Sequence, residues 1–381
     1  MNWRENSRRL KKRAHQAKQV AKAGVIVGGI GTGLALGLGA ASVGLFLRKR
    51  AQRYRYDLAG KVVVITGGSR GLGFALAQEC AGQGASVAIC ARDEQELRRA
   101  KQTIEAGAEA EVFTHVCNVS SDDEVRQFIS SVVARFGQID VLINNAGIIS
   151  VGPVESQTLA DFEEAMDVMY WGVVYPTLAA LPHMQSRQEG RIANIASIGG
   201  KMSVPHLLPY SAAKFAAVGF SEGLRAELAK DGVKVTTVCP GLMRTGSHLN
   251  AYFKGKHRQE FTWFSFGAST PLVSIDARRA ARKIIDAIRG GDAELVITPQ
   301  AKLAALAHGI APGAIANVLG VANRLMPKAN GDKDRYLGRD SQTALTRSFL
   351  QTAGHKAADE YHQHREEPPL LQNHLFNRET A

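Results

Sequence analysis

The chain has 381 residues, an apolar content of 45% and a formal net charge of +12. That apolar content supports a packed core and argues against a disordered protein. Residues 1–56 hold 13 of the 47 basic residues and one of the 35 acidic ones, so the other 325 residues carry 34 of each and are neutral. We therefore expect no nucleic-acid partner for the body of the chain.

The N-terminal segment contains a long uncharged stretch. Ala23 to Leu47 are 25 residues without a charged side chain. A helix of that length, at about 1.5 Å per residue, exceeds the roughly 30 Å hydrocarbon core of a bilayer. Gly29, Gly33 and Gly37 lie on one face of such a helix and would allow close helix–helix contact. We expect residues 1–22 to form a basic tail and residues 23–47 a transmembrane anchor helix.

Two other interpretations of this segment stay open. Ser7-Arg8-Arg9-Leu10-Lys11-Lys12 resembles a twin-arginine export signal, although Arg9 is far from Ala23 for such a signal. The apolar stretch could also form a hairpin or an interfacial segment. Basic residues flank the stretch on both sides, so the positive-inside rule does not fix its orientation.

From Lys61 onward, short apolar runs alternate with helical patterns. The expected strands are 61–66, 86–91, 110–117, 141–144, 191–197, 234–239 and 294–298, and the expected helices are 72–83, 94–106, 122–136, 159–187, 211–230 and 276–289. Such alternation is typical of βαβ units. The predicted fold class is therefore α/β: a Rossmann-type, doubly wound parallel sheet of about seven strands over residues 57–300, followed by a helical extension at 301–381. Ligands of such folds bind beyond the carboxyl ends of the strands.

The first expected strand runs into the sequence TGGSRGLG. Its glycines stand where the strand turns into a helix, and residues without a Cβ let the backbone approach a pyrophosphate. The N-terminus of the helix adds unpaired N–H groups and a partial positive charge. This placement predicts a dinucleotide-binding loop. The candidate contacts are Thr66, Gly67, Ser69, Arg70, Gly71, Leu72 and Gly73.

Two arginines indicate which dinucleotide binds. Arg70 lies within the loop, and Arg92 follows the second strand. A carboxylate at the end of that strand would bind a ribose 2′-hydroxyl, whereas an arginine suits a 2′-phosphate. Asp93 comes one place late for the carboxylate role and fits a helix N-cap. NADP(H) is therefore favoured, with NAD(H) as the alternative.

No metal site is expected. Cys80, Cys90, Cys117 and Cys239 form no CxxC pair and are expected to be small buried hydrophobes. The eleven histidines show no ligand spacing such as HExxH.

Ser197, Tyr210 and Lys214 follow in this order, the last two at i and i+4 on one helix face. NNAG, residues 144–147, ends the fourth expected strand. Together with the glycine loop, these motifs resemble the short-chain dehydrogenase/reductase family over about residues 57–300. The resemblance implies a dinucleotide-dependent oxidoreductase with a Ser-Tyr-Lys catalytic set.

The residue types themselves suit carbonyl reduction. A hydride that moves to a carbonyl leaves an alkoxide, which needs a proton. A tyrosine can supply it if its pKa of ~10 is lowered, as Lys214 and the positive charge of the cofactor would do. Ser197 can donate a hydrogen bond to the developing oxyanion.

The resemblance also implies further cofactor contacts and an assembly. Tyr210 and Lys214 would lie at the nicotinamide ribose. The remaining implied contacts are Asn118, Val119, Asn144, Ala146, Gly147, Pro240, Gly241 and Thr245. Family members often pair through the helices that correspond to 159–187 and 211–230, which implies a homodimer or homotetramer.

Two positions depart from the family pattern. The milder departure is Asn118-Val119, where the family often has Asp-Val near the adenine, and an Asn can still hydrogen-bond there. The family helix usually reads close to DVNxxG, and its Asn completes a Ser-Tyr-Lys-Asn tetrad that holds a water on the proton path to the Lys. Here the helix reads DVMYWG, with Met169 at that place. A thioether is a weak acceptor and no donor. Another group or extra water could substitute, proton delivery could be slower, or catalysis could be secondary.

Two regions outside these motifs bear on the substrate. Loop 246–270 carries six aromatic residues, which suggest an apolar substrate or form ordinary core: Tyr252, Phe253, Phe261, Trp263, Phe264 and Phe266. Beyond residue 300, an apolar helical stripe follows a break at Pro312-Gly313: Ile315, Val318, Leu319 and Ala322. We expect the stripe to cover the substrate pocket as a lid, with a second membrane contact as the alternative.

The sequence thus predicts a membrane-anchored NADP(H)-dependent oxidoreductase with a cytoplasmic catalytic domain. It would interconvert a carbonyl and an alcohol on a lipophilic, lipid-like or steroid-like molecule. The alternative is a membrane-anchored dinucleotide-binding scaffold or sensor whose turnover is weak because of Met169. An exported enzyme is a third interpretation, but it conflicts with the need for an intracellular pool of recycled cofactor.

Overall fold

The computed structural model describes residues 56–270, 274–343, 346 and 356–363. All of them belong to the unit Tyr56–Ala381. The preceding unit, Met1–Arg55, contains the predicted anchor at residues 23–47, which lies outside the described residues. Among the helices of the described part, none is both long enough and apolar enough to cross a membrane.

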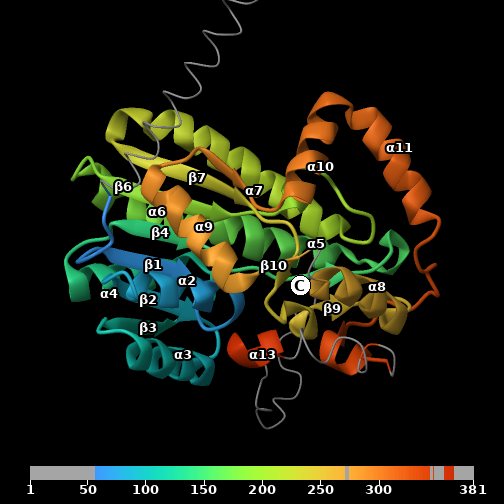
Figure 1. The fold of residues 1–381 in the computed structure, drawn as a ribbon, viewed down its shortest axis with the longest axis horizontal. Helices are drawn as coiled ribbons and strands as arrows, with labels where there is room; N and C mark the ends of the chain where they lie inside the picture. The colour runs from blue at the N-terminus through green and yellow to red at the C-terminus, as the bar shows by residue number, and fades with distance from the viewer. Residues whose placement is uncertain (1–55, 271–273, 344–345, 347–355, 364–381) are drawn as a thin grey trace, which may run out of the picture. The chain divides into compact units, whose positions relative to one another are not determined.

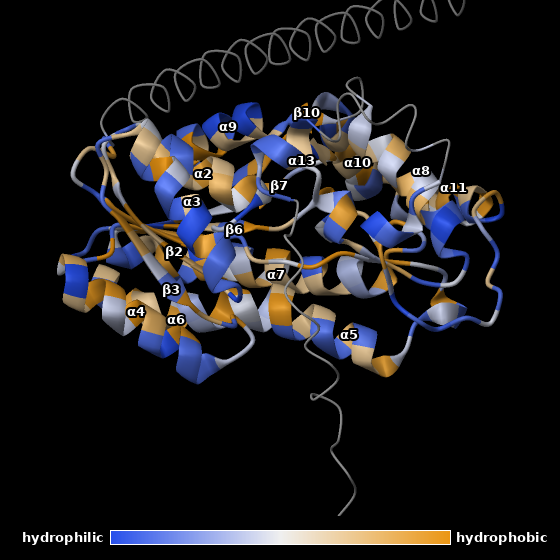
Figure 2. Ribbon diagram, turned by 90° about the horizontal axis from the view of Figure 1, so that it is seen from below, coloured by the Kyte–Doolittle hydropathy of each residue, from blue (hydrophilic) through white to orange (hydrophobic). Residues whose placement is uncertain are grey.

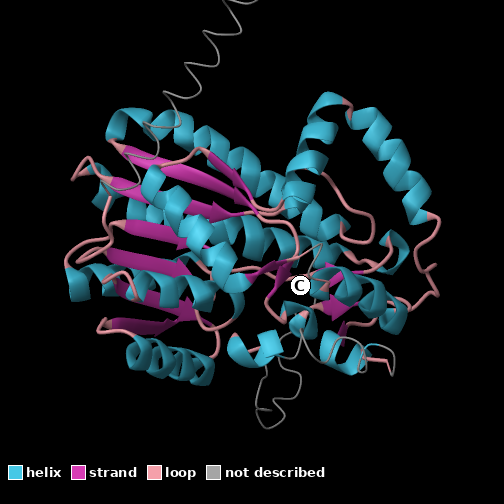
Figure 3. Cartoon of the chain, in the orientation of Figure 1, coloured by secondary structure: helices cyan, strands magenta, loops and turns pink. Residues whose placement is uncertain are grey.

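The centre of the described unit is a seven-stranded sheet in the order β11-β7-β6-β4-β1-β2-β3. Its strands are β1 (Val62–Thr66), β2 (Ser86–Ala91), β3 (Val112–Val116), β4 (Val141–Asn144), β6 (Gly190–Ile195), β7 (Val233–Cys239) and β11 (Glu294–Val296). Every pairing within this sheet is parallel, so all carboxyl ends meet at one edge, where the arrowheads lie in Figure 3. The predicted fold class is confirmed for this part of the chain.

Helices cover both faces of the sheet because its strands are apolar on both sides. In β1, Val63 and Ile65 belong to one core cluster, while Val62 and Val64 belong to the other. The first cluster includes residues of α2 (Gly71–Ala81), α3 (Glu94–Gly107) and α9 (Ala277–Gly290). The second includes residues of α4 (Asp122–Phe136), α6 (Gly172–Gln185) and α7 (Leu208–Glu227). Figure 2 shows α2 and α9 on the opposite side of the strands from α4 and α6.

The helix expected over residues 159–187 is interrupted. It consists of α5 (Leu159–Met166), a π-helical turn (Asp167–Trp171) and α6. The apolar spacing stays helical on both sides, so the sequence did not reveal the interruption. Isolated π-helical turns occur frequently at functional sites, and this one contains Met169.

Smaller elements lie beyond the carboxyl edge of the sheet. They are β5 (Ser150–Val151), β9 (Tyr252–Phe253) and β12 (Tyr336–Leu337) in a second sheet, β8 (Met243–Arg244) paired with β10 (Ile275–Asp276), α8 (His257–Ser269) and α13 (Lys356–Glu360). Three of the predicted aromatic residues form a small core here, namely Phe253, Phe261 and Phe264. Trp263 packs against this core as well, so ordinary packing accounts for four of the six aromatic residues.

The break expected at Pro312-Gly313 separates α10 (Pro299–Ile310) from α11 (Pro312–Asn323). These two helices stand out from the sheet at the upper right of Figure 1. Their surface is unusually apolar: the exposed side chains include Leu303, Leu306, Ile310, Val318, Val321 and, just after α11, Leu325. Within the predicted stripe, Leu319 is partly buried and Val318 is exposed.

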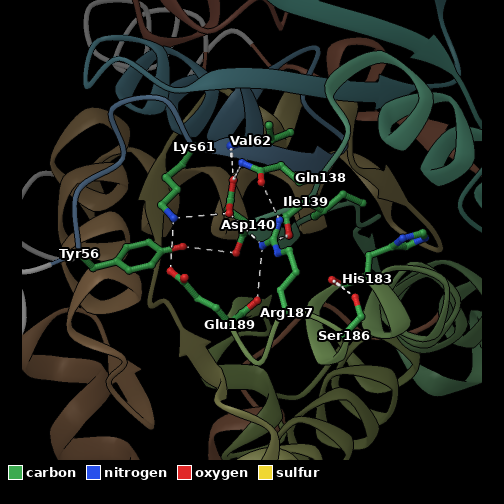
Figure 4. A network of polar contacts seen from close by, with 10 residues as sticks. All are labelled: Tyr56, Lys61, Val62, Gln138, Ile139, Asp140, His183, Ser186, Arg187 and Glu189. Atoms are coloured by element: carbon green, nitrogen blue, oxygen red, sulfur yellow. Dashed lines mark hydrogen bonds and ion pairs between the residues drawn. The ribbon is translucent and has the colours of Figure 1, made fainter.

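The opposite edge of the sheet is closed by a polar network around Asp140 (Figure 4). The carboxylate of Asp140 is buried and accepts hydrogen bonds from the Val62 amide at 2.8 Å and from Arg187 at 2.9 Å. Lys61 adds a cation 3.6 Å away. A buried carboxylate needs such partners, and these contacts fix the start of β1 to the segment that precedes β4.

Candidate active site

A cleft of about 290 Å³ lies at the carboxyl edge of the sheet. It is bounded by the loops that follow β1, β2, β3 and β4, and by the start of α7. Because β1 continues toward β2 on one side while β4 continues toward β6 on the other, this is the switch point of the sheet, where open α/β folds bind their ligands.

The glycine loop connects β1 to α2 and forms one wall of the cleft. Gly67 has φ of +65°, and a Cβ at this residue would lie 2.9 Å from Cα of Ala146. Only glycine therefore lets the two loops approach this closely. The Thr66 hydroxyl accepts hydrogen bonds from the Asn145 and Ala146 amides, at 2.9 and 3.2 Å, which ties the NNAG segment to the loop.

Most of the predicted cofactor contacts line this cleft. They are Gly67, Ser69, Arg70, Gly71, Leu72, Gly73, Arg92, Asn118, Val119, Ala146, Gly147, Tyr210, Lys214 and Thr245. The other four, Thr66, Asn144, Pro240 and Gly241, are not among the lining residues. Thr66 instead has the supporting role described above.

Asn144 was expected in the cleft, but its side chain points into the protein. Its amide donates to Thr177 at 2.9 Å and to Asn194 at 2.8 Å, and all three residues are buried. As the last residue of β4, it pairs in register with Asn194 of β6 and belongs to the sheet. The next residue, Asn145, lines the cleft instead and donates to the Thr66 and Gly67 carbonyls at 3.0 Å. The sequence did not single out Asn145.

Pro240 and Gly241 also lie away from the cleft. The Pro240 carbonyl accepts a hydrogen bond from the Ile198 amide at 2.8 Å, which fixes the turn after Ser197. A Cβ at Gly241 would lie 2.8 Å from the Thr298 hydroxyl, since the start of α10 packs there. Both residues support the loops around the site and do not line the cleft.

The two arginines differ in their surroundings. Arg70 forms an ion pair with the buried Glu96 at 2.9 Å, and Ser69 donates to the same carboxylate at 3.0 Å. Arg92 is exposed at the cleft, and no hydrogen bond or ion pair engages it among the described residues. Asp93 accepts a hydrogen bond from the Glu96 amide at 3.0 Å and is the N-cap of α3, as predicted.

Tyr210 and Lys214 line the other end of the cleft, whereas the predicted Ser197 is not among its lining residues. The Ser197 hydroxyl accepts a hydrogen bond from the Gly199 amide at 3.0 Å, and the Lys214 ammonium donates to the Ile195 carbonyl at 2.8 Å. Burial raises the pKa of Tyr210, and the Ser197 hydroxyl lowers it in part. Burial lowers the pKa of Lys214 to about 8. Without a cofactor, therefore, the tyrosine is a proton donor, and the lysine, with a pKa of about 8, is mostly charged at pH 7.

Met169 lies beside Lys214. Only 1% of its surface is exposed, within the π-helical turn. The Met169 Cγ and the Lys214 Nζ each lie 3.8 Å from the point where a Cβ on Gly147 would stand. The thioether thus packs against the surroundings of the ammonium and offers it no hydrogen-bonding group of ordinary strength.

A second cavity, of about 390 Å³, lies between α11 and the loop that precedes α7. Its lining includes Val204, Pro205, Leu208, Ala316, Leu319 and Gly320. His206 is the buried polar group of this wall, with Nδ1 2.8 Å from the Glu260 carboxylate, which also accepts from Trp263 at 2.7 Å. The lining of the cavity is mostly apolar. One of its residues, Leu208, precedes Tyr210 by two residues on α7.

Sequence reasoning missed the residues that come to the cleft from late in the chain. Asn250, Leu337 and Gln363 line it, and so does Tyr252, which the sequence had named only in the aromatic group of loop 246–270. The first three belong to no motif and arrive through the packing of distant segments, so the sequence offered no signal for them.

Comparisons with known proteins find relatives of this chain. A family model described as short chain dehydrogenase matches residues 61–252. The chain is 36% identical over 267 residues to a dehydrogenase/reductase SDR family protein 7-like of Anopheles gambiae, covering 68% of this chain and 82% of that protein. It is 34% identical over 250 residues to 11-beta-hydroxysteroid dehydrogenase A of Sesamum indicum, covering 64% and 70%. A crystal structure of an actinorhodin polyketide ketoreductase variant with NADPH matches with a TM-score of 0.56 at 29% identity, covering 62% and 95%.

Proposed function

The chain belongs to the short-chain dehydrogenase family, and we propose that it is an NADP(H)-dependent oxidoreductase that interconverts a carbonyl and an alcohol on a lipophilic molecule. Residues 57–300 would form its catalytic domain. The observation that carries the proposal is a single cleft with a glycine loop at one end and Tyr210 and Lys214 at the other. No residue cluster suited to a metal occurs among the described residues, and the proposed chemistry requires none.

The cleft fits a dinucleotide. The start of α2 presents backbone N–H groups where a pyrophosphate would lie, and Arg92 stands where a 2′-phosphate would lie. The NADPH in the related ketoreductase structure supports this choice. When bound, NADPH supplies the hydride. The protein supplies the rest: a binding surface, an oriented carbonyl and a proton.

Replacing Arg92 with Ala is expected to raise the dissociation constant for NADPH by about 10- to 100-fold and to leave NADH binding unchanged. The guanidinium has no competing partner among the described residues, and a charge-assisted hydrogen bond of about 1.5–3 kcal/mol corresponds to that range. Fluorescence titration with both nucleotides measures the change. Arg98→Ala is the matched control, since Arg98 lies on α3 away from the cleft. Equal losses for NADPH and NADH would contradict the assignment.

Proton transfer is assigned to Tyr210. Its phenol would donate the proton to the alkoxide that forms on reduction, and would accept it during oxidation. Ser197 would donate a hydrogen bond to the carbonyl oxygen as negative charge develops. Lys214, held by the Ile195 carbonyl, would stabilise the phenolate by its charge and bind the ribose.

The second cavity supports a lipophilic substrate. Its apolar lining lies beside the start of α7, with His206 as its buried polar group. The apolar side chains exposed on α10 and α11 lie next to it and would face a lipid or an apolar ligand more favourably than water. The hydroxysteroid dehydrogenase of Sesamum indicum is a relative with a substrate of this class in its name.

The membrane anchor remains part of the proposal. Eight residues lie between Leu47 and Tyr56, and an extended chain reaches at most about 3.6 Å per residue. An anchor at residues 23–47 would therefore hold the catalytic unit within about 30 Å of the bilayer, close to a lipid-dissolved substrate. We propose the cytoplasmic side, where the cofactor is recycled, and a homodimer or homotetramer through the α5–α6 and α7 surfaces.

The test of the proposed function uses the full chain in lipid vesicles, as wild type and as Met169→Asn. NADPH and NADH oxidation is followed against aldehydes and ketones of increasing chain length and ring number. We expect the wild type to reduce apolar carbonyls with NADPH and to discriminate against short polar ones. A faster variant would show that Met169 limits proton delivery.

Met169 also motivates the alternative function, a dinucleotide-binding scaffold or sensor. If the wild type binds NADPH without turnover and Met169→Asn gains turnover, the scaffold is favoured over the enzyme. If neither protein binds a dinucleotide, both functions are wrong.

A further inference from the structure

The end of the described chain packs directly onto the glycine loop. Residues 356–363, named here the C-terminal segment, include Ala358 and Tyr361, which are 0% and 1% exposed. Ala358 fits against Gly246, where a Cβ would lie 2.6 Å from Cα of Ala358. His362 stacks on Phe74 of α2 with ring centroids 4.2 Å apart. The segment is therefore an integral wall of the cleft.

The C-terminal segment changes which N–H groups of the glycine loop are available to an anion. The Gly71 amide, at the first position of α2, donates to the Tyr361 carbonyl at 2.8 Å. An N–H group at a helix start is normally available to a phosphate. Here the carbonyl of the C-terminal segment takes that donor.

The side-chain amide of Gln363 places another hydrogen-bond donor next to Gly71. It lines the cleft and is 4% exposed, and its Nε2 lies 2.6 Å from the point where a Cβ on Gly71 would stand. Among the described residues, Nε2 has no hydrogen-bond partner. Nε2 therefore offers a donor at the surface of the cleft and can bond to a ligand there.

The orientation of the amide follows from Asn250. One atom of the Asn250 side chain lies 2.8 Å from the backbone carbonyl oxygen of Gln363, which can only accept, so that atom is Nδ2. The same Nδ2 lies 2.8 Å from the nearer oxygen of the Gln363 side chain, which must therefore be Oε1. The NH₂ group of Gln363 is left facing Gly71 and the cleft.

We propose that Gln363 binds the diphosphate of the dinucleotide, with its Nε2 donating to an anionic oxygen that lies over the glycine loop. Asn250 is the positioning residue that holds the amide in this orientation. The inference rests on the proposed dinucleotide function and adds to it a binding residue from outside the family core.

The test compares Gln363→Glu with wild type in the full chain. A Glu keeps an oxygen for Asn250 but replaces the donor with a negative oxygen that repels the diphosphate. We expect the dissociation constant for NADP⁺ to rise about 10- to 100-fold. Adenosine 2′-monophosphate, which lacks the diphosphate, should bind as it does to wild type. The dissociation constant of Gln363→Ala for NADP⁺ should lie between those of wild type and Gln363→Glu. Gln127→Glu, on the exposed face of α4, controls for the added charge.

The outcomes separate this inference from the function on which it rests. If wild type binds NADP⁺ and Gln363→Glu binds it equally well, Gln363 is not a diphosphate contact. If Gln363→Glu loses NADP⁺ and adenosine 2′-monophosphate equally, the substitution disturbs the cleft as a whole and the inference is wrong. If wild type binds no dinucleotide, the inference and the proposed function fall together.

Discussion

Tyr210→Phe is expected to lower kcat/KM by about 10²- to 10⁴-fold while NADPH binds as tightly as it does to wild type. The substitution removes only the hydroxyl that would transfer the proton. The ring, which packs against the core beside α5 and α6, is kept. Steady-state kinetics with an apolar ketone, together with a fluorescence titration of NADPH, measure the two quantities separately.

The pH dependence gives a second readout for Tyr210. Burial raises its pKa, so the phenol stays protonated through neutral pH and reduction should not require low pH. Oxidation needs the phenolate, and its rate should rise with pH. The Ser197 hydroxyl lowers the pKa of Tyr210, so in Ser197→Ala this rise should move to higher pH. If Tyr210→Phe keeps wild-type turnover, the assignment of proton transfer to Tyr210 is wrong.

Lys214→Met is expected to abolish most turnover and, at the same time, to stabilise the fold. Lys214 is 4% exposed, and burial lowers its pKa to about 8 from an ordinary value near 10.5. A shift of that size corresponds to roughly 3 kcal/mol against folding at pH 7. The lost hydrogen bond to the Ile195 carbonyl, worth about 1 kcal/mol, offsets part of the gain. We expect the free energy of unfolding to rise by about 2 kcal/mol at pH 7.

The sign of the pH dependence tests the same point. Between pH 8 and 10.5 the folded protein has lost the Lys214 proton while the unfolded chain still holds it. The unfolded state therefore binds more protons, and the stability of the wild type should increase with pH across this window. The Met variant lacks this increase, so its advantage should shrink above pH 8. Urea unfolding at pH 7 and pH 10 measures both proteins. A variant less stable than wild type at pH 7 would contradict the assigned cost of burying the lysine.

Together these variants describe a site in which function and stability oppose each other. A buried ammonium destabilises the folded state, yet the reaction proposed here needs a positive charge close to Tyr210. The interrupted helix has the same character, since the π-helical turn that contains Met169 gives up regular helical hydrogen bonding close to the site.

The sequence by itself determined the fold class and the order of the elements. The strands at 86–91 and 141–144 and the helix at 122–136 were predicted with the bounds that the structure has. These predictions succeed because apolar periodicity and glycine turns are local properties, set by neighbours within a few residues. The glycine loop and the Tyr210–Lys214 pair are also recognised from residues close together in the sequence. Residues of both motifs line the cleft.

Only the tertiary structure decided which side chains reach the cleft. Asn144 and Asn145 are adjacent and identical in type, yet packing against β6 turns the first inward and leaves the second to the cleft. Gln363 lies far along the chain from Gly71, and no sequence pattern joins the two residues. They come together because Ala358 and Tyr361 are buried beside Gly246 and α2. Contacts between distant segments depend on how whole elements pack, and a sequence read locally does not contain that information.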